Sequence, residues 1–332
     1  MKLTFGSLEE ALPGRKWQAL FALHWEAYRR WFLSEGPRAR LPYHSSRKQL
    51  LAHMPELVAT YDRLAELAGG SDLAARFLSL YRPPPYLTGC SQAIWGGAEP
   101  LLARNYDYSP QLCEAVVLKS AWNGRGVIAL SDCLWGVLDG VNQTGLAMSL
   151  SFGGSRAVGE GFGVPLLLRY ALELCTSTAE ACEALARIPS HMAYNVAVVD
   201  ASGDYRTVYL APGRGGEVRR VAVSTNHQDT IEWHDHARAT GTIERERHLY
   251  QRLRDPAASP ERLVRAFLQP PVYSNAFARG FGTLYTAVYY PRRGAMELLW
   301  PGLRWQLSFD DFREEQVVVR YPQVADDLQP LH

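Results

Sequence analysis

The chain has 332 residues, of which 47% are hydrophobic and 21% are charged, and its formal net charge is +1. This length and composition are ordinary for a globular protein with a large core, built as one large domain or two. The small net charge supplies no basic field for nucleic acid or for an anionic membrane surface, so we expect neither as a partner.

The start of the chain is acidic at residues 9 and 10 and lacks the apolar core of a signal peptide. No run approaches the ~20 consecutive apolar residues that a membrane-spanning helix needs. The five cysteines are odd in number and have no scaffold-like spacing, which fits a reducing compartment better than a disulfide framework. We therefore expect a cytoplasmic protein.

The first part of the chain is predicted to be helical. Its apolar residues recur at helical spacing, and the pattern stops at three successive prolines, 83–85, which favour a stiff extended segment. We therefore expect the first 85 residues to be helical, and the pattern of the chain changes a few residues before Cys90. Helices are predicted over residues 14–34, 47–67 and 72–81.

Two short apolar runs flank a glycine-containing turn, a pattern that predicts a β-hairpin over residues 87–108. Folding about the turn at 96–99 sets Cys90 roughly opposite Asn105. Asp107 then lies on the Cys90 side by the period-two rule, and Arg104 points to the other face unless the strand ends or bulges. The hairpin thus gathers groups suited to catalysis: a thiol, an amide and a carboxylate.

Beyond the hairpin, blocks of short strands alternate with pairs of helices, which indicates a layered α+β fold. Strands are predicted at 114–119, 127–131, 134–138, 145–152, 194–200, 205–210, 218–224, 283–290 and 295–300. Helices are predicted at 165–175, 178–188, 242–254 and 259–268.

Gly89-Cys90 followed by Arg104-Asn105-Tyr106-Asp107 resembles the N-terminal-nucleophile (Ntn) hydrolases of the acyl-CoA:6-aminopenicillanate acyltransferase type, which are distant relatives of the choloylglycine and penicillin V hydrolases. The resemblance covers roughly residues 86 to 310. It implies an α+β fold, a four-layer αββα sandwich preceded by the helical segment. The further matches, in chain order, are Asn142-Gln143-Thr144-Gly145-Leu146, Thr225-Asn226-His227, Arg245 and Thr283-Leu284-Tyr285-Thr286-Ala287-Val288-Tyr289.

The resemblance implies that the chain itself cuts the Gly89–Cys90 bond and that Cys90 becomes the nucleophile. A free α-amine titrates near ~7.7–8.0, so the new amino group can accept the thiol proton at neutral pH without a distant histidine. The expected pieces, 1–89 and 90–332, stay attached to each other. The implied activity is hydrolysis or transfer of an acyl group at a linear, non-peptide amide or thioester.

The resemblance also implies roles for the residues around Cys90. Asp107 would orient the α-amine, Arg104 and Arg245 would complete the charge network, and Asn226 would donate to the oxyanion. Three further residues are expected in the oxyanion hole or behind it: Asn105, Ser151 and Asn142. Ser151, or a backbone amide, stands where some relatives carry an asparagine, and Asn142 fits a turn residue better than a catalytic one.

No metal or nucleotide cofactor is implied, and acyl-CoA is a donor by family analogy only. His234-Asp235-His236 lacks the spacing of a zinc motif, which favours a surface loop. Two alternatives stay open: an uncleaved thiol hydrolase that uses Cys90 with His227, and a non-catalytic binding protein on the same fold. The sequence leaves the substrate, the choice between hydrolysis and transfer, and assembly into a homo-oligomer undetermined.

Overall fold

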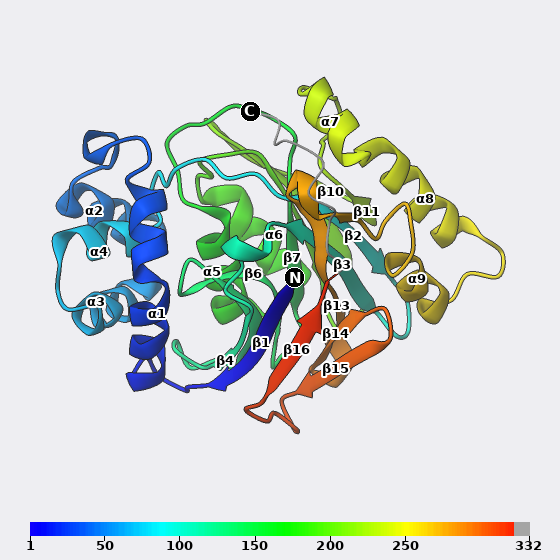
Figure 1. Cartoon of the computed structure of the whole chain (residues 1–332), viewed down its shortest axis with the longest axis horizontal. Helices are drawn as coiled ribbons and strands as arrows, with labels where there is room; N and C mark the ends of the chain where they lie inside the picture. Colours follow the sequence, from blue (N-terminus) through cyan, green and yellow to red (C-terminus); the bar gives the residue numbers. More distant parts are fainter. Residues whose placement is uncertain (322–332) are drawn as a thin grey trace.

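In the computed structural model, which describes residues 1–321, two β-sheets pack face to face between two layers of helices (Figure 1). Helices α5 (Val164–Leu174) and α6 (Thr178–Arg187) pack on the outer face of the larger sheet. Helices α8 (Thr242–Arg254) and α9 (Pro260–Phe267) cover the smaller sheet. This is the α+β, four-layer αββα sandwich expected from the resemblance.

In the described part of the chain, the larger sheet has nine strands in the order β10-β9-β8-β7-β6-β5-β4-β1-β16. Neighbouring strands are antiparallel except β1 and β4, which run parallel. The bounds of these strands are β1 (Lys2–Glu9), β4 (Val116–Ser120), β5 (Val127–Asp132), β6 (Gly136–Asn142), β7 (Ala147–Phe152), β8 (Tyr194–Val199), β9 (Tyr205–Ala211), β10 (Arg214–Arg219) and β16 (Gln316–Arg320).

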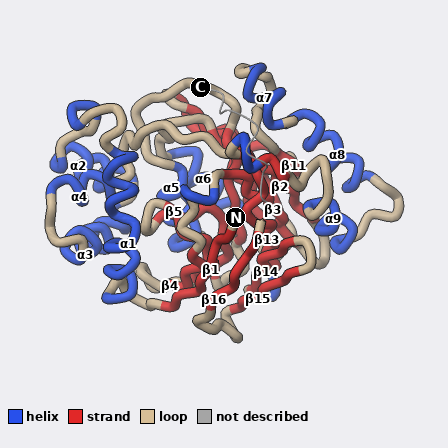
Figure 2. Tube along the Cα trace, in the orientation of Figure 1, coloured by secondary structure: helices blue, strands red, loops and turns tan. Residues whose placement is uncertain are grey.

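The smaller sheet, within residues 1–321, has the order β11-β2-β3-β13-β14-β15, and β12 adds to β13. The predicted hairpin is β2 and β3, near the centre of this sheet. The strands of the two sheets lie in the middle of the molecule, with helices on either side (Figure 2). The bounds are β2 (Gly89–Trp95), β3 (Leu101–Tyr108), β11 (Val223–Ser224), β12 (Asn275–Ala276), β13 (Phe281–Tyr290), β14 (Ala295–Trp300) and β15 (Leu303–Ser308).

The N-terminal segment is not wholly helical, because its first residues form β1. This strand lies inside the larger sheet between β4 and β16, where Phe5 is fully buried. The predicted helix over 47–67 is two helices, since Pro55 lacks the N–H that a helix interior needs and starts a short 3-10 turn instead. The helices of this segment are α1 (Arg15–Phe32), α2 (Tyr43–His53), α3 (Val58–Leu67) and α4 (Asp72–Leu78).

The helices α1 to α4 gather at one end of the molecule, and α7 (His234–Thr240), α8 and α9 at the other (Figure 1). The strand predicted over 218–224 is two strands in different sheets, because the chain crosses from β10 to β11 there. Strands β15 and β16 were not predicted. Both lie beyond the last predicted strand, and most of their side chains are at least partly exposed.

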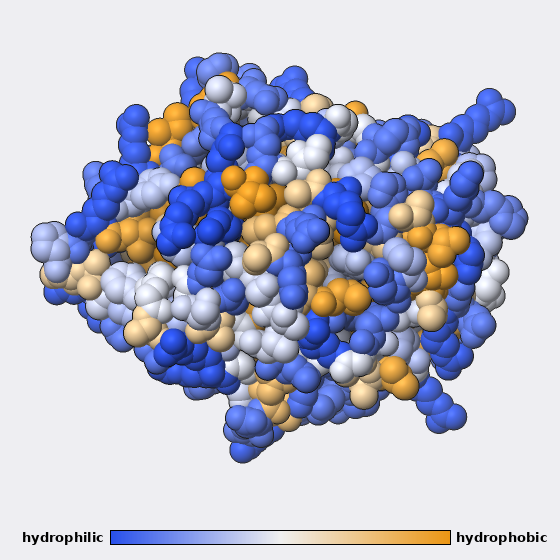
Figure 3. Space-filling view, turned by 180° about the vertical axis from the view of Figure 1, so that it is seen from behind, coloured by the Kyte–Doolittle hydropathy of each residue, from blue (hydrophilic) through white to orange (hydrophobic). Residues whose placement is uncertain are grey.

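The face seen in Figure 3 is mostly hydrophilic, and its hydrophobic residues form small separate groups. The cysteines are all free thiols. None of the helices within residues 1–321 is long and apolar enough to cross a membrane.

Candidate active site

The hairpin places Cys90 directly opposite Tyr106, whereas the sequence analysis set it opposite Asn105. A shift of one residue exchanges the two faces of a strand. Arg104 therefore lies on the same side as the Cys90 side chain, and the expectation that it points away is wrong. Asp107 pairs with Gly89 and belongs to the other side.

The Cys90 side chain is fully buried and has two polar neighbours. Arg104 donates from Nη2 to the sulfur at 3.3 Å, and the Thr88 hydroxyl lies 3.5 Å from it. Burial raises the pKa of the Cys90 thiol, and the charge of Arg104 and the hydrogen bond with Thr88 only partly offset this. The thiol of the intact chain is therefore protonated at neutral pH and needs a base to react.

Arg104 is held by groups from both sheets. It forms a buried ion pair with Asp139 of β6, donates from Nε to the carbonyl of Leu150 at 2.9 Å, and donates to the Tyr285 hydroxyl at 3.0 Å. Tyr285 and Tyr289 both donate to the Asp139 carboxylate. Asp139 was not among the residues predicted from the sequence. An acid in an otherwise apolar or neutral strand is a usable signal, because a buried carboxylate needs a partner.

The backbone of Cys90 is held from the other side of the strand. Arg245 of α8 donates from Nη1 to the Cys90 carbonyl and to the Ser91 hydroxyl, both at 2.6 Å, and from Nη2 to Asn226 Oδ1 at 2.7 Å. Asn226 Oδ1 also accepts the Cys90 backbone N–H at 3.0 Å. The nitrogen that cleavage would turn into an α-amine thus lies within hydrogen-bond distance of Asn226.

Asp107 contacts Arg245 and so belongs to the group of residues around the Cys90 backbone. Its Oδ2 lies 3.6 Å from Arg245 Nη1, and its Oδ1 accepts the Thr283 hydroxyl at 2.6 Å. Burial raises the pKa of Asp107 to about 6, although the charge of Arg245 and the hydrogen bond from Thr283 lower it. Asp107 is therefore mostly ionised at neutral pH and protonated in mild acid.

A polar hollow of about 490 Å³ opens beside these groups. Gly89, Asp107 and Arg245 border it, together with the end of α7 and the loop after α9. The hollow gives water a route to the Gly89–Cys90 bond, although the Cys90 side chain itself is buried.

Three predicted residues are not brought to the sulfur. The Asn105 amide donates to the carbonyl of Phe267 at the end of α9 at 2.8 Å and to that of Val272 in the following loop at 3.1 Å, and so fixes this part of the chain to the sheet. Asn142 accepts two backbone N–H groups of its own turn, as a turn residue does. Ser151 donates to the Thr225 carbonyl at 2.8 Å and so supports the turn that carries Asn226.

Gly154 is a further residue that the sequence analysis missed. Its φ of +78° favours glycine, and a Cβ there would lie 2.6 Å from the backbone oxygen of Asn226. The residue lets the loop after β7 approach the turn that carries Asn226. The Gly153-Gly154 pair directly after a predicted strand was the signal.

His227 contacts two residues of helix α8. His227 Nδ1 lies 3.0 Å from the Thr242 hydroxyl, and its Nε2 lies 3.4 Å from a Glu246 carboxylate oxygen. The sequence 234–236 begins helix α7, so the surface loop predicted there is wrong. Among the described residues, no group of three or more His, Cys, Asp or Glu side chains is arranged to hold a metal ion.

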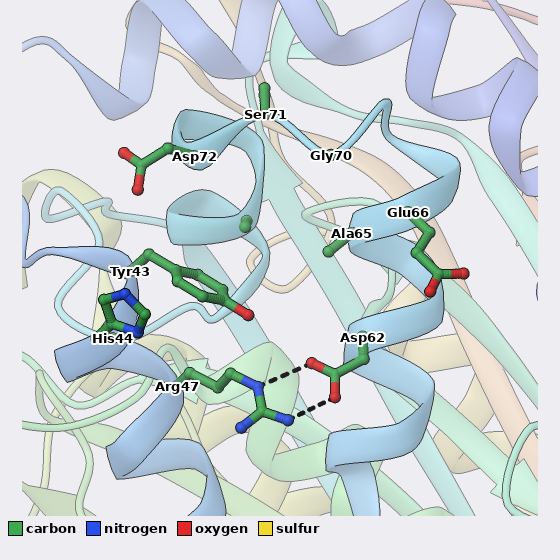
Figure 4. Close-up of a pocket in the computed structure, with 10 residues that line it drawn as sticks. Tyr43, His44, Arg47, Asp62, Ala65, Glu66, Gly70, Ser71 and Asp72 are labelled. Carbon is green, nitrogen blue, oxygen red and sulfur yellow. Dashed lines mark hydrogen bonds and ion pairs between the residues drawn. The ribbon is translucent and has the colours of Figure 1, made fainter.

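Another hollow, of about 680 Å³, lies among α2, α3 and α4 (Figure 4). Its central guanidinium, Arg47, is bound by both carboxylate oxygens of Asp62 at 2.9 and 2.6 Å. Only residues between 43 and 75 line this hollow, so none of the predicted site residues borders it.

Comparisons with solved structures find Ntn hydrolases at low identity. Penicillin V acylase from Agrobacterium tumefaciens is 15% identical over 68% of this chain and 90% of its own, with a TM-score of 0.47. The Caenorhabditis elegans ortholog of N-acylethanolamine-hydrolyzing acid amidase is 17% identical over 61% and 93%, with a TM-score of 0.46. A mutant of conjugated bile acid hydrolase from Clostridium perfringens is 11% identical over 72% and 100%, with a TM-score of 0.46.

A comparison with curated proteins found no match. The family described as acyl-coenzyme A:6-aminopenicillanic acid acyl-transferase matches residues 95–305. This match begins at the last residue of β2, so it includes Arg104, Asp107, Asn226 and Arg245 but not Cys90. Since it spans more than half of the sequence, the chain belongs to the acyl-coenzyme A:6-aminopenicillanic acid acyl-transferase family.

Proposed function

We propose that this protein is a self-processing amidohydrolase or acyltransferase that acts on a linear, non-peptide amide or thioester through an acyl-enzyme at Cys90. One observation carries the proposal: three side chains hold three different atoms of the same residue. Arg104 contacts the sulfur, Asn226 the backbone nitrogen and Arg245 the backbone oxygen of Cys90. Membership of an acyltransferase family supports the same chemistry.

The first step is cleavage of the chain. The Cys90 sulfur attacks the Gly89 carbonyl carbon, a C–S bond forms, and the C–N bond to Cys90 breaks as the thiol proton passes to its nitrogen. Water entering from the polar hollow then hydrolyses this thioester, which leaves a carboxylate on Gly89 and restores the thiol. The segment 1–89 stays attached after the cut, because β1 lies inside the larger sheet.

The freed amine is the base of the second step. At neutral pH part of the α-amine is neutral and takes the thiol proton, while Asn226 Oδ1 and the Asp107 carboxylate orient it. Arg104 stabilises the thiolate. The sulfur attacks the substrate carbonyl, and the ammonium returns its proton to the departing amine or thiol. Water then releases the acyl group as an acid, or an amine accepts it, which gives hydrolysis or transfer.

Cleavage also frees an oxyanion donor. In the intact chain, Asn226 Nδ2 donates to the Phe152 carbonyl at 3.4 Å and to the Thr88 carbonyl at 3.2 Å, one residue before the bond to be cut. Movement of this end of the segment would release that N–H for the oxyanion of the substrate. A donor of this kind is worth ~2.7–4 kcal/mol of transition-state stabilisation.

The acyl donor is a small molecule, and acyl-CoA enters only through the family's description. No cofactor takes part in these steps. Because all the cysteines are free thiols, we place the reaction in the cytoplasm.

The test is the mass of the protein after exposure to a simple acyl thioester. We expect one acyl group on Cys90, found by peptide mapping and removed by hydroxylamine. Cys90→Ala should show no adduct, and the matched variant Cys182→Ala, which alters a buried helix residue, should be labelled like the parent. An adduct on another residue, or none on the parent protein, would contradict the proposal.

A further inference from the structure

A second cavity, of about 110 Å³, lies between the N-terminal segment and the sheets. Its walls come from α1, from the extended segment that leads to Cys90, from β3 and from the loops before β4 and after β5. The walls carry five aromatic rings: Tyr28, Trp31, Tyr86, Tyr106 and Tyr108.

The cavity adjoins the nucleophile through Tyr106. Tyr106 is the cross-strand partner of Cys90, and directly opposed residues have Cβ atoms ~4.5–5.5 Å apart on one face of the sheet. The Tyr106 ring lies 4.7 Å from the Arg104 guanidinium, which contacts the Cys90 sulfur. A substrate carbonyl at the sulfur would therefore have its acyl chain beside this cavity.

Two carboxyl groups share one wall of the cavity. The Tyr28 hydroxyl lies 2.5 Å from Glu114 Oε1 and 3.3 Å from Asp132 Oδ1. The lining includes no lysine or arginine, and His24 is its one basic side chain. Burial, and then the charge of Glu114, raise the pKa of Asp132 to about 7. A cation in the cavity would supply the positive charge that this pair lacks.

We propose that this cavity binds a primary ammonium at the end of a short acyl chain, between its aromatic rings and the carboxyl groups of Glu114 and Asp132. Aromatic faces attract cations, and a carboxylate accepts strong hydrogen bonds from an ammonium. The volume limits the group to a few heavy atoms, since a cavity of ~150 Å³ holds one benzene. The inference rests on the proposed function and narrows its substrates to aminoacyl amides or thioesters.

The first test compares two thioesters of equal length, β-alanyl and butyryl, in which an ammonium replaces a methyl group. We expect the parent protein to prefer the amino compound by about tenfold or more in kcat/KM, as for a hydrogen bond to a charged group. Asp132→Asn should lower this preference to near unity. The matched control Glu99→Gln, an exposed carboxylate at the hairpin turn, should keep it. Equal rates for the two thioesters in the parent, or a preference that survives in Asp132→Asn, would overturn the inference.

The second test needs no turnover. Binding of butylammonium chloride to the Cys90→Ala protein is measured by calorimetry, with butanol as the uncharged analogue and sodium chloride at matched ionic strength. We expect butylammonium to bind and Asp132→Asn to weaken it by about tenfold. Tyr28→Phe, which removes the hydroxyl between the two carboxyl groups, is the second variant if Asp132→Asn unfolds, and should also weaken binding.

The two tests separate the proposals. If butylammonium binds and neither thioester acylates Cys90, the proposed function fails and the cavity assignment stands. If both thioesters react at equal rates and butylammonium does not bind, the cavity assignment is wrong and the proposed function still holds.

Discussion

Arg104 donates a hydrogen bond to the sulfur of Cys90 at 3.3 Å while the same guanidinium pairs with Asp139 of the opposite sheet. All three side chains are fully buried. The group that favours the thiolate is therefore also the counter-charge of a buried acid. Removing it should change two separate quantities, the reactivity of the thiol and the stability of the fold.

Arg104→Met should lower both the reactivity of the Cys90 thiol and the stability of the fold. We expect the free energy of unfolding to fall by about 3–5 kcal/mol, because Asp139 is left as an unpaired buried charge. We expect acylation of Cys90 to slow by about 10²-fold, because the thiolate loses its cation. Denaturant unfolding and the rate of acylation by a thioester measure the two effects.

The double variant Arg104→Met/Asp139→Asn is the control. It removes both charges, so it should recover most of the lost stability and none of the lost rate. Recovery of the rate together with the stability would show that Arg104 acts only on the fold.

Asp107 should add a limb near pH 6 to the pH–rate profile, below the limb that titration of the α-amine near ~7.7–8.0 gives. Burial raises its pKa to about 6, so it carries a charge above that pH and loses it below. We expect kcat/KM to fall as the pH drops through about 6, because the protonated acid no longer orients the α-amine. Asp107→Asn should be slow at every pH and should lack this limb of the pH–rate profile. If this limb persists unchanged in Asp107→Asn, the titration of another group causes it.

The same shift predicts how the stability of the uncut Cys90→Ala protein depends on pH. The pKa of Asp107 is higher in the folded chain than in the unfolded chain, where the ordinary value is ~3.9. The contribution of Asp107 to stability is therefore complete below about pH 4 and is lost as the pH rises through about 6. The difference between Cys90→Ala and Cys90→Ala/Asp107→Asn in denaturant unfolding at pH 4 and pH 7 measures this contribution.

Asn226 and Asn105 form a matched pair of buried amides with different contacts. Asn226→Ala should reduce kcat by about 10²–10³-fold, since it removes an oxyanion donor and a partner of the Cys90 nitrogen. Asn105→Ala should lower stability by about 1–3 kcal/mol, because it removes the donor of two buried carbonyls at α9, and should change kcat little. Similar losses of kcat in the two variants would remove Asn226 from the mechanism.

Substitution of His227 distinguishes the proposed self-processing enzyme from an uncleaved thiol hydrolase that uses Cys90 with His227. Its ring nitrogens lie near Thr242 and Glu246, so in our account it supports the turn of Asn226. His227→Ala should lower the acylation rate by less than about tenfold, against 10²–10⁴-fold for loss of a general base. A loss in the larger range would favour the histidine-dependent alternative.

The fold could be predicted from the sequence wherever the periodicity was strong. The hairpin, the helices of 90–332 and most strands follow from apolar spacing and turn residues. β1 was missed, because a strand that pairs with segments more than 100 residues away in the chain has little local signal. The prediction of one helix over 47–67 overlooked Pro55, although a proline lacks the N–H that a helix interior needs and interrupts a helix in any protein.

The structure brings Cys90, Arg104, Asp107, Asn226 and Arg245 together, but not in the geometry predicted from the sequence. The turn of the hairpin was taken as four residues, whereas Trp95 pairs with Leu101 and Pro100 belongs to the turn. That one residue moves Arg104 to the thiol side of the strand and Asp107 to the other. The partners of Arg104 come from β6 and β13, and Arg245 comes from α8, so only the tertiary structure brings these groups together.

The central claim is that the Gly89–Cys90 bond is cut and that the two pieces remain together. N-terminal sequencing and intact mass of the purified active protein test it most directly. We predict a second amino terminus at Cys90 and two fragments, 1–89 and 90–332, that elute together in gel filtration and separate only in denaturant, whereas Cys90→Ala stays as one chain. A single full-length chain in protein that acylates and turns over substrate would contradict the account.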